Sequence, residues 1–261
     1  MRNFILLFFA LLISLSSCSQ KMTKDEIIDK YVTNCSKKYN YNYQLKEYQK
    51  CLDKGLEKDS TIAYLWQQKA MPYFKARKYE VGMEYIDKAV EYDKEWLDYR
   101  AFIKCVFAKT YKEAIIDFEK CIKLNGNSYV MDHTYEFYIG LSYLQLNEFE
   151  KATILFEKYI NELEKELGEE WLHPTGLFYL GISKYEQEKY KEAIIDFNRA
   201  LKIYPEFSDV KYYKSVCLMY LGENEKSKAT FLEYKEDASN GFSINEDNAI
   251  YEVYPYQVIN K

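Results

Sequence analysis

Apolar and polar residues follow the period of an α-helix through most of this chain. Large apolar side chains recur three or four positions apart between residues 29 and 241, and the central region lacks the alternation of a β-strand. The octapeptide Tyr-Lys-Glu-Ala-Ile-Ile-Asp-Phe occurs twice, at 111–118 and at 190–197. A helical segment used twice is typical of a repeat array. The pattern therefore predicts an all-α fold of stacked helical units.

The second octapeptide lies within a longer pattern of spaced residues. This pattern consists of Leu177, Leu180, Gly181, Tyr190, Ala193, Phe197, Ala200 and Pro205. It resembles the tetratricopeptide repeat, a pair of antiparallel helices of about 34 residues. We expect Gly181 to face Ala193 where the two helices approach, and Pro205 to end the second helix because proline has no amide hydrogen. The resemblance implies a right-handed α-solenoid of about five to six such pairs.

The register of this unit places the others along the chain. The predicted units are 29–62, 63–96, 95–128, 133–166, 174–207 and 208–241. Insertions at 129–132 and 167–173 account for the spacing of the octapeptides, and both fall between units, where loop length varies at little cost. The second helix of the unit at 133–166 should continue to Leu167 and stop at Gly168. Residues 242–261 lie beyond the units, as a cap on the last helix pair, a segment folded back into the groove or a free tail.

The N-terminus carries an export pattern. A short basic leader precedes an apolar run from Phe4 to Leu15, which is too short to span a bilayer comfortably. Leu15-Ser16-Ser17-Cys18 resembles a bacterial lipobox, which implies a signal peptide at 1–17, fatty acylation such as palmitate at Cys18 and a polar tether at 18–28. The expected location is the bacterial cell envelope, anchored to the membrane by lipid, with the outer membrane favoured. The alternative is a secretory signal whose cysteine is incidental.

Composition and candidate chemistry argue against catalysis. The formal net charge of −5 provides no general attraction for nucleic acid. The two histidines, His133 and His173, lie at the starts of units, and we expect neither to have a carboxylate and a nucleophile beside it. The paired-cysteine spacing of a zinc site and the glycine-rich loop of a phosphate site are absent from the sequence. We therefore predict no enzyme activity, no metal site and no cofactor.

The cysteines matter because export places them in an oxidising compartment. Cys35 and Cys51 fall nearly opposite each other in the unit at 29–62, so a disulfide could join them; otherwise both are small core residues. We expect Cys105, Cys121 and Cys217 to be core residues.

Arrays of this family hold ligands on the concave face formed by the first helix of each pair. The resemblance implies that partners contact a mostly aromatic set, namely Tyr64, Gln67, Phe74, Tyr99, Arg100, Phe137, Tyr138, Phe178, Tyr185 and Tyr212. An aromatic groove with few fixed charges suits a protein or peptide segment. The alternative is that many of these rings pack between units.

These features predict a membrane-anchored, extracytoplasmic scaffold that binds another protein without catalysis. Two other functions remain open from the sequence. One is an immunity lipoprotein that neutralises a toxin, and the other is a component of outer-membrane assembly, because lipoproteins of the β-barrel insertion machinery have a similar architecture.

Overall fold

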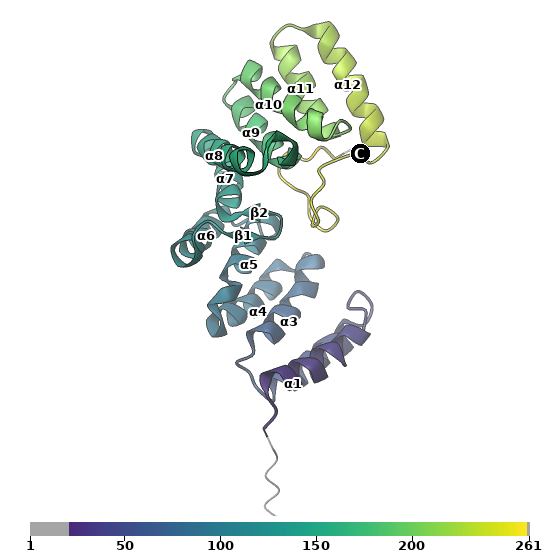
Figure 1. Ribbon diagram of the computed structural model, residues 1–261. Coiled ribbons are helices and arrows are strands. Elements are labelled where there is room, and N and C mark those ends of the chain that lie inside the picture. The colour runs from purple at the N-terminus through teal and green to yellow at the C-terminus, as the bar shows by residue number, and fades with distance from the viewer. Residues whose placement is uncertain (1–20, 260–261) are drawn as a thin grey trace, which may run out of the picture.

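The computed structural model describes residues 21–259 of the 261-residue chain. The predicted signal peptide and Cys18 lie outside the described residues. The described part is a curved stack of helix pairs, with the chain running from α1 at one end to α12 at the other (Figure 1). Within residues 21–259, no helix is both long enough and apolar enough to cross a membrane.

Six antiparallel helix pairs account for most of the described residues. The first combines α1 (Lys24–Ile28) and a π-helical turn (Asp29–Thr33) with α2 (Leu45–Leu56). The others are α3 (Ala63–Lys75) with α4 (Tyr79–Tyr92), α5 (Leu97–Phe102) and a π-helical turn (Ile103–Phe107) with α6 (Tyr111–Asn125), α7 (Tyr135–Gln145) with α8 (Phe149–Leu167), α9 (Pro174–Glu186) with α10 (Tyr190–Ile203), and α11 (Ser208–Tyr220) with α12 (Asn224–Ser239). The predicted all-α solenoid is confirmed.

Short 3-10 turns and one small hairpin connect the helices. The turns are Ser36–Lys38, Lys94–Trp96 and Glu169–Trp171. Strands β1 (Tyr129–Val130) and β2 (His133–Thr134) pair antiparallel around the insertion at 129–132. Helix α8 continues to Leu167 and stops at Gly168, whose φ of 97° favours glycine. Both insertions therefore lie between helix pairs.

The first helix begins inside the segment predicted to be a tether. Thr23 caps α1 by accepting a hydrogen bond from the Glu26 amide, and the Glu26 carboxylate accepts one from the Thr23 amide. This reciprocal arrangement satisfies two amides that the helix itself leaves unpaired. Ile27 is buried against α2 and α3 in a small N-terminal cluster. The prediction of a tether through residue 28 is therefore wrong from Lys24 onward.

The glycine of the repeat unit permits close packing, but its partner differs from the expectation. A Cβ at Gly181 would lie 2.4 Å from a ring carbon of Phe197, and the nearest atoms all belong to that ring rather than to Ala193. In the second pair the arrangement is reversed, because Gly82 lies on α4 and Phe74 covers it from α3. A phenylalanine ring seated on glycine thus joins the two helices in both units.

Each octapeptide also contributes one buried carboxylate. Asp117 pairs with Arg100 and Lys104 at 2.8 Å, and Asp196 pairs with Lys184 at 2.9 Å. The cations come from the first helix of the same pair, so each ion pair links the two helices of a unit. Together with the burial of Phe118 and Phe197, these ion pairs show that the repeated segment holds the two helices of its unit together.

A disulfide joins Cys35 and Cys51, with their Cα atoms 5.7 Å apart. It ties the segment after α1 to α2 in the first helix pair. Among the described residues, Cys105, Cys121 and Cys217 are free and buried.

Candidate functional site

The concave face is partly filled by the protein's own C-terminus. Residues 242–259, here called the C-terminal loop, leave α12 and run back along the inner side of the array toward β2 (Figure 1). Of the three alternatives left open by the sequence, this is the segment folded back into the groove. Phe231 and Leu232 on α12 stay exposed, so the loop does not cap the outer face of the last pair.

One carboxylate closes the base of the C-terminal loop. Asp209, at the start of α11, accepts hydrogen bonds from the amides of Ile244 at 2.9 Å and Val258 at 2.6 Å, and from the Ser243 hydroxyl at 2.9 Å. Because Asp209 binds residues near both ends of the loop, the two ends lie close together. Asp209 is fully buried beneath it.

The far end of the loop reaches the second and third helix pairs. Glu252 accepts hydrogen bonds from the Tyr79 hydroxyl and, at 2.9 Å, from Lys109 Nζ. Lys75 Nζ donates to the Tyr251 hydroxyl at 3.3 Å. These contacts bring together residues more than 140 positions apart in the chain, since Lys109 and Glu252 are separated by 143. The loop therefore spans the inner face from α11 to α3.

Aromatic residues seat the middle of the loop in the groove. Tyr254 is buried, and the Tyr179 hydroxyl donates to the Pro255 carbonyl at 3.1 Å. The Tyr256 hydroxyl donates to a Glu186 oxygen at 2.7 Å. The groove thus holds the loop through both a backbone hydrogen bond and a buried ring.

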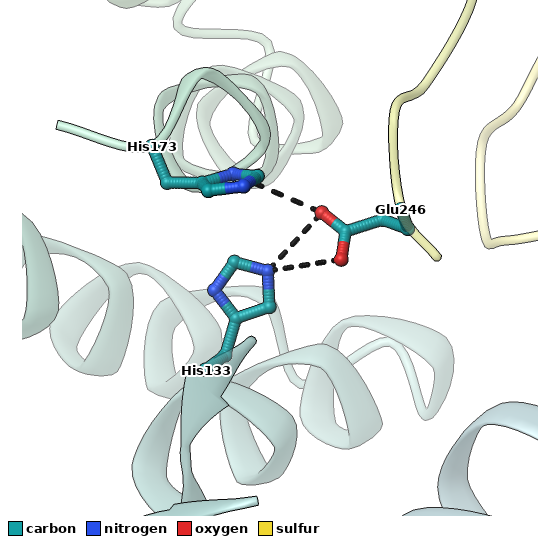
Figure 2. A group of neighbouring side chains, drawn as sticks. All are labelled: His133, His173 and Glu246. Carbon is teal, nitrogen blue, oxygen red and sulfur yellow. Dashed lines mark hydrogen bonds and ion pairs between the residues drawn. The ribbon is translucent and has the colours of Figure 1, made fainter. Parts of the chain in front are cut away.

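Two imidazoles and a carboxylate meet beneath the loop. Glu246 points from the C-terminal loop between His133 on β2 and His173, the residue before α9 (Figure 2). His133 Nε2 lies 3.1 Å and 3.2 Å from the two Glu246 oxygens, and His173 Nδ1 lies 3.8 Å from the nearer one. The sequence predicted that neither histidine would have a carboxylate and a nucleophile beside it, and the structure places the Glu246 carboxylate beside both.

The electrostatics of this cluster are set by burial. Desolvation, with His133 beside it, lowers the pKa of His173 to about 4, so the His173 ring is neutral at pH 7. Burial disfavours the charged form of Glu246, but the hydrogen bond and electrostatic attraction of His133, with smaller contributions from His173 and Thr175, together outweigh it and lower the carboxyl pKa below its ordinary value. A carboxylate and a neutral imidazole thus face each other in a buried space.

The part of the concave face that the loop leaves open lies between α3 and α5. A pocket of about 730 Å³ opens beside Tyr64, Trp96 and Tyr99, and a smaller one of about 240 Å³ lies over Gln67, Phe74 and Tyr99. Tyr99 lines both pockets, and the two together are here called the α3–α5 groove. Asn248 of the C-terminal loop also lines the smaller pocket.

The ten residues predicted to contact a partner fall into different environments. Tyr64, Gln67, Phe74 and Tyr99 line the α3–α5 groove. Phe137, Tyr138 and Phe178 are almost completely buried in the core, as are Gln67 and Phe74 at the floor of the groove. Tyr185 and Tyr212 are half-buried and pack edge-on against Tyr213. Phe137, Tyr138 and Phe178 therefore form core, as the packing alternative stated.

Arg100 also has a structural role. Its guanidinium makes two hydrogen bonds to Asp117, at 2.8 Å and 2.9 Å, and a third to Asp87 at 2.8 Å. This arrangement engages the guanidinium within the protein and links α5 to α6 and to α4. Arg100 was predicted to contact a partner. That prediction did not consider that a basic residue on the first helix of a pair can bind the aspartate of the octapeptide on the second helix.

The folded-back C-terminal segment was one of three alternatives from the sequence, but the roles of Glu246 and Asp209 within it were not predicted. One signal was present for the histidines. Both precede the first helix of consecutive units, and first helices begin at the same edge of a stacked array. Glu246 carried no comparable signal, because it lies 113 positions from His133 outside the repeats.

Comparison with known proteins agrees with the fold. The tetratricopeptide repeat model matches residues 174–207. No curated protein sequence matches the chain. The chain therefore contains one tetratricopeptide repeat at residues 174–207, and its six helix pairs have the tetratricopeptide fold.

Solved structures with this fold cover most of the chain. A tetratricopeptide repeat protein from Parabacteroides merdae aligns with a TM-score of 0.63 at 16% identity, over 85% of this chain and 80% of that one. PilW, described as a widely conserved type IV pilus biogenesis factor, aligns with a TM-score of 0.63 at 13% identity, over 83% and 94%. YrrB, described as having an unusual peptide-binding site, aligns with a TM-score of 0.51 at 19% identity, over 72% and 93%.

Proposed function

We propose that this chain is a non-catalytic scaffold, anchored in the bacterial envelope through Cys18, that binds an extended segment of another protein in the α3–α5 groove. The observation that carries the proposal is the pair of pockets that share Tyr99, left open beside a face that already holds a polypeptide. Fold relatives of this class act as protein-binding scaffolds, and YrrB is described as binding peptide.

The chemistry of the groove defines the segment it would accept. Tyr64 stacks on Trp96 with ring centroids 6.2 Å apart, and Tyr99 meets Trp96 edge-on at 6.0 Å. Aromatic surfaces of this kind provide contact area at a small entropic cost, because the rings have few rotatable bonds. The C-terminal loop, which lies beside this groove, also places tyrosines, Tyr251 and Tyr254, on the same inner face. We therefore expect a partner segment that is extended and carries apolar or aromatic side chains.

The test combines membrane crosslinking with groove variants. Wild-type protein, Tyr64→Ala and Tyr99→Ala would be crosslinked in intact cells and the captured protein identified and quantified. Tyr43→Ala is the matched control, because Tyr43 is exposed and lies outside both pockets. We expect each groove variant to lose at least about tenfold in affinity for the captured partner, which corresponds to about 1.4 kcal/mol. Equal capture by all four proteins would place the binding surface elsewhere.

The anchor is tested separately by acylation. Labelled palmitate should enter the wild-type protein and fail to enter Cys18→Ser, which should then leave the membrane fraction on washing. Two or more acyl chains hold a protein stably at a membrane, whereas an unacylated chain has no such anchor. Labelling of Cys18→Ser at the wild-type level would contradict the proposed anchor.

A further inference from the structure

We propose that His133, His173 and Glu246 bind one divalent cation of the zinc class, which fastens the C-terminal loop to the concave face. The three residues come from β2, from the start of α9 and from the C-terminal loop (Figure 2). Each offers one ligand atom, and these atoms all lie within 4.8 Å of one another.

The distances between ligand atoms are close to those of a metal site. In tetrahedral zinc sites with bonds of about 2.0–2.1 Å, neighbouring ligand atoms lie roughly 3.4 Å apart. The Glu246 oxygen Oε1 lies 3.1 Å from His133 Nε2 and 3.8 Å from His173 Nδ1. Movements of less than about 1 Å, within reach of side-chain rotation, would bring all three atoms onto one ion.

An unpartnered ring nitrogen points to a missing ligand. His173 Nδ1 is inaccessible to solvent and makes no hydrogen bond within the described residues. Buried polar atoms in folded proteins are almost always paired, so this unpaired nitrogen next to a carboxylate and a second imidazole calls for an explanation. A cation bound between them would satisfy His173 Nδ1 and the Glu246 charge together.

The surroundings of His133 suit a ligand. Its Nδ1 lies 2.9 Å from the Tyr159 hydroxyl, and its ring stacks on Phe137 with centroids 3.7 Å apart. A tyrosine hydroxyl both donates and accepts, so it can pair with either tautomer of the imidazole. With Nδ1 protonated and donating to Tyr159, the Nε2 lone pair faces the ion, and a metal-bound histidine likewise donates its other ring N–H to a neighbouring acceptor.

The ligand set indicates the kind of ion. Imidazole nitrogens favour zinc and other late transition metals, whereas magnesium and calcium require a larger set of oxygens. Because the third ligand belongs to the C-terminal loop, binding the ion would also stabilise the docked loop. The site concerns contacts within the chain, so it does not depend on the proposed partner binding.

Zinc titration of the untagged full chain tests the proposal. After treatment with a chelator, calorimetry should give one Zn²⁺ per chain, and hydrogen exchange at residues 244–258 should slow when Zn²⁺ is added. His173→Ala removes a half-exposed ligand, so it should keep the fold and lose about 100-fold or more in affinity. Tyr159→Phe removes an outer contact and should lose about tenfold, at the lower end of the usual range.

A carboxylate outside the histidine–glutamate cluster provides the control for the zinc titration. Glu225→Gln, which changes an exposed carboxylate on α12, should bind Zn²⁺ as the wild type does. Absence of binding to the wild type would overturn the proposal, and so would equal affinity in the wild type and His173→Ala. Binding that leaves exchange in the loop unchanged would overturn the fastening role. Thermal unfolding of each metal-free variant provides the check that it is folded.

Discussion

The Glu252 carboxylate lies 2.9 Å from Lys109 Nζ, although Lys109 belongs to the third helix pair and Glu252 follows it by 143 positions in the C-terminal loop. Glu252 is buried in the C-terminal loop, whereas Lys109 lies before α6 with a φ of 58°. Tyr79 donates to the same carboxylate, and Arg77 Nε lies 3.8 Å from it. Two helix pairs thus hold one carboxylate of the C-terminal loop, which links the second and third units to the far end of the chain.

Removing the Glu252 carboxylate should release the far end of the loop. Hydrogen bonds to charged groups contribute about 1.5–3 kcal/mol, so Glu252→Ala should lower the free energy of unfolding by about 2 kcal/mol. Hydrogen exchange should accelerate at residues 248–256, and the helices should keep their protection. Glu225→Ala on α12 is the control and should change neither quantity. Unchanged exchange in Glu252→Ala would show that the aromatic contacts alone hold the loop.

Tyr138 should respond in opposite ways to two substitutions. Its ring is 1% exposed, and its hydroxyl is buried without a hydrogen-bond partner within the described residues. Tyr138→Ala should lower the free energy of unfolding by about 3–5 kcal/mol, because it leaves a cavity. Tyr138→Phe removes the unpaired hydroxyl and should raise it by about 1 kcal/mol. Denaturant unfolding measures both, and a destabilised Tyr138→Phe would reveal an unseen partner for the hydroxyl.

The disulfide should stabilise the first helix pair. Cys35 and Cys51 are 16 positions apart, and closing a loop of about this length contributes about 3 kcal/mol. Reductant should therefore lower the stability of the wild type and increase proteolysis near α2. The double variant Cys35→Ser/Cys51→Ser should not respond to reductant.

A thiol assay gives an independent check of the cysteines. Burial raises the pKa of the Cys105, Cys121 and Cys217 thiols to about 12 each, so all three stay protonated at pH 8 and react slowly in the folded protein. After denaturation without reductant, residues 21–259 should provide three reactive thiols. Five would show that Cys35 and Cys51 are not joined.

Two glycines at the same place in consecutive first helices should differ in their tolerance of alanine. A Cβ at Gly181 would lie 2.4 Å from the buried Phe197 ring, whereas one at Gly140 would lie 3.2 Å from Phe156. Gly181→Ala should lower the free energy of unfolding by about 1–3 kcal/mol through overpacking. At Gly140 the gain in helix propensity, about 1 kcal/mol, should offset the milder contact. Equal effects in denaturant unfolding would contradict this difference.

The frame of the protein follows from local patterns in the sequence. Helical spacing placed the five pairs from α3 to α12, and Gly168 predicted where α8 ends, because these features depend on residues a few positions apart. Thr23 and Glu26 also carried a capping signal, which the tether interpretation overlooked. The partner contacts were predicted less well than the helices. A ring at a given repeat position of a first helix, such as Tyr138, can point either into the core or into the groove.

Only the tertiary structure decided what occupies the concave face. The sequence left residues 242–261 with three alternatives, and no periodic pattern connects Glu246 to His133 or Glu252 to Lys109. Each of these contacts joins a repeat to a segment outside the repeats, so it depends on the curvature of the whole array and on the path of the returning chain. Helical periodicity determined the scaffold because it is local, whereas the filled groove and the histidine–glutamate cluster depend on residues brought together only by folding.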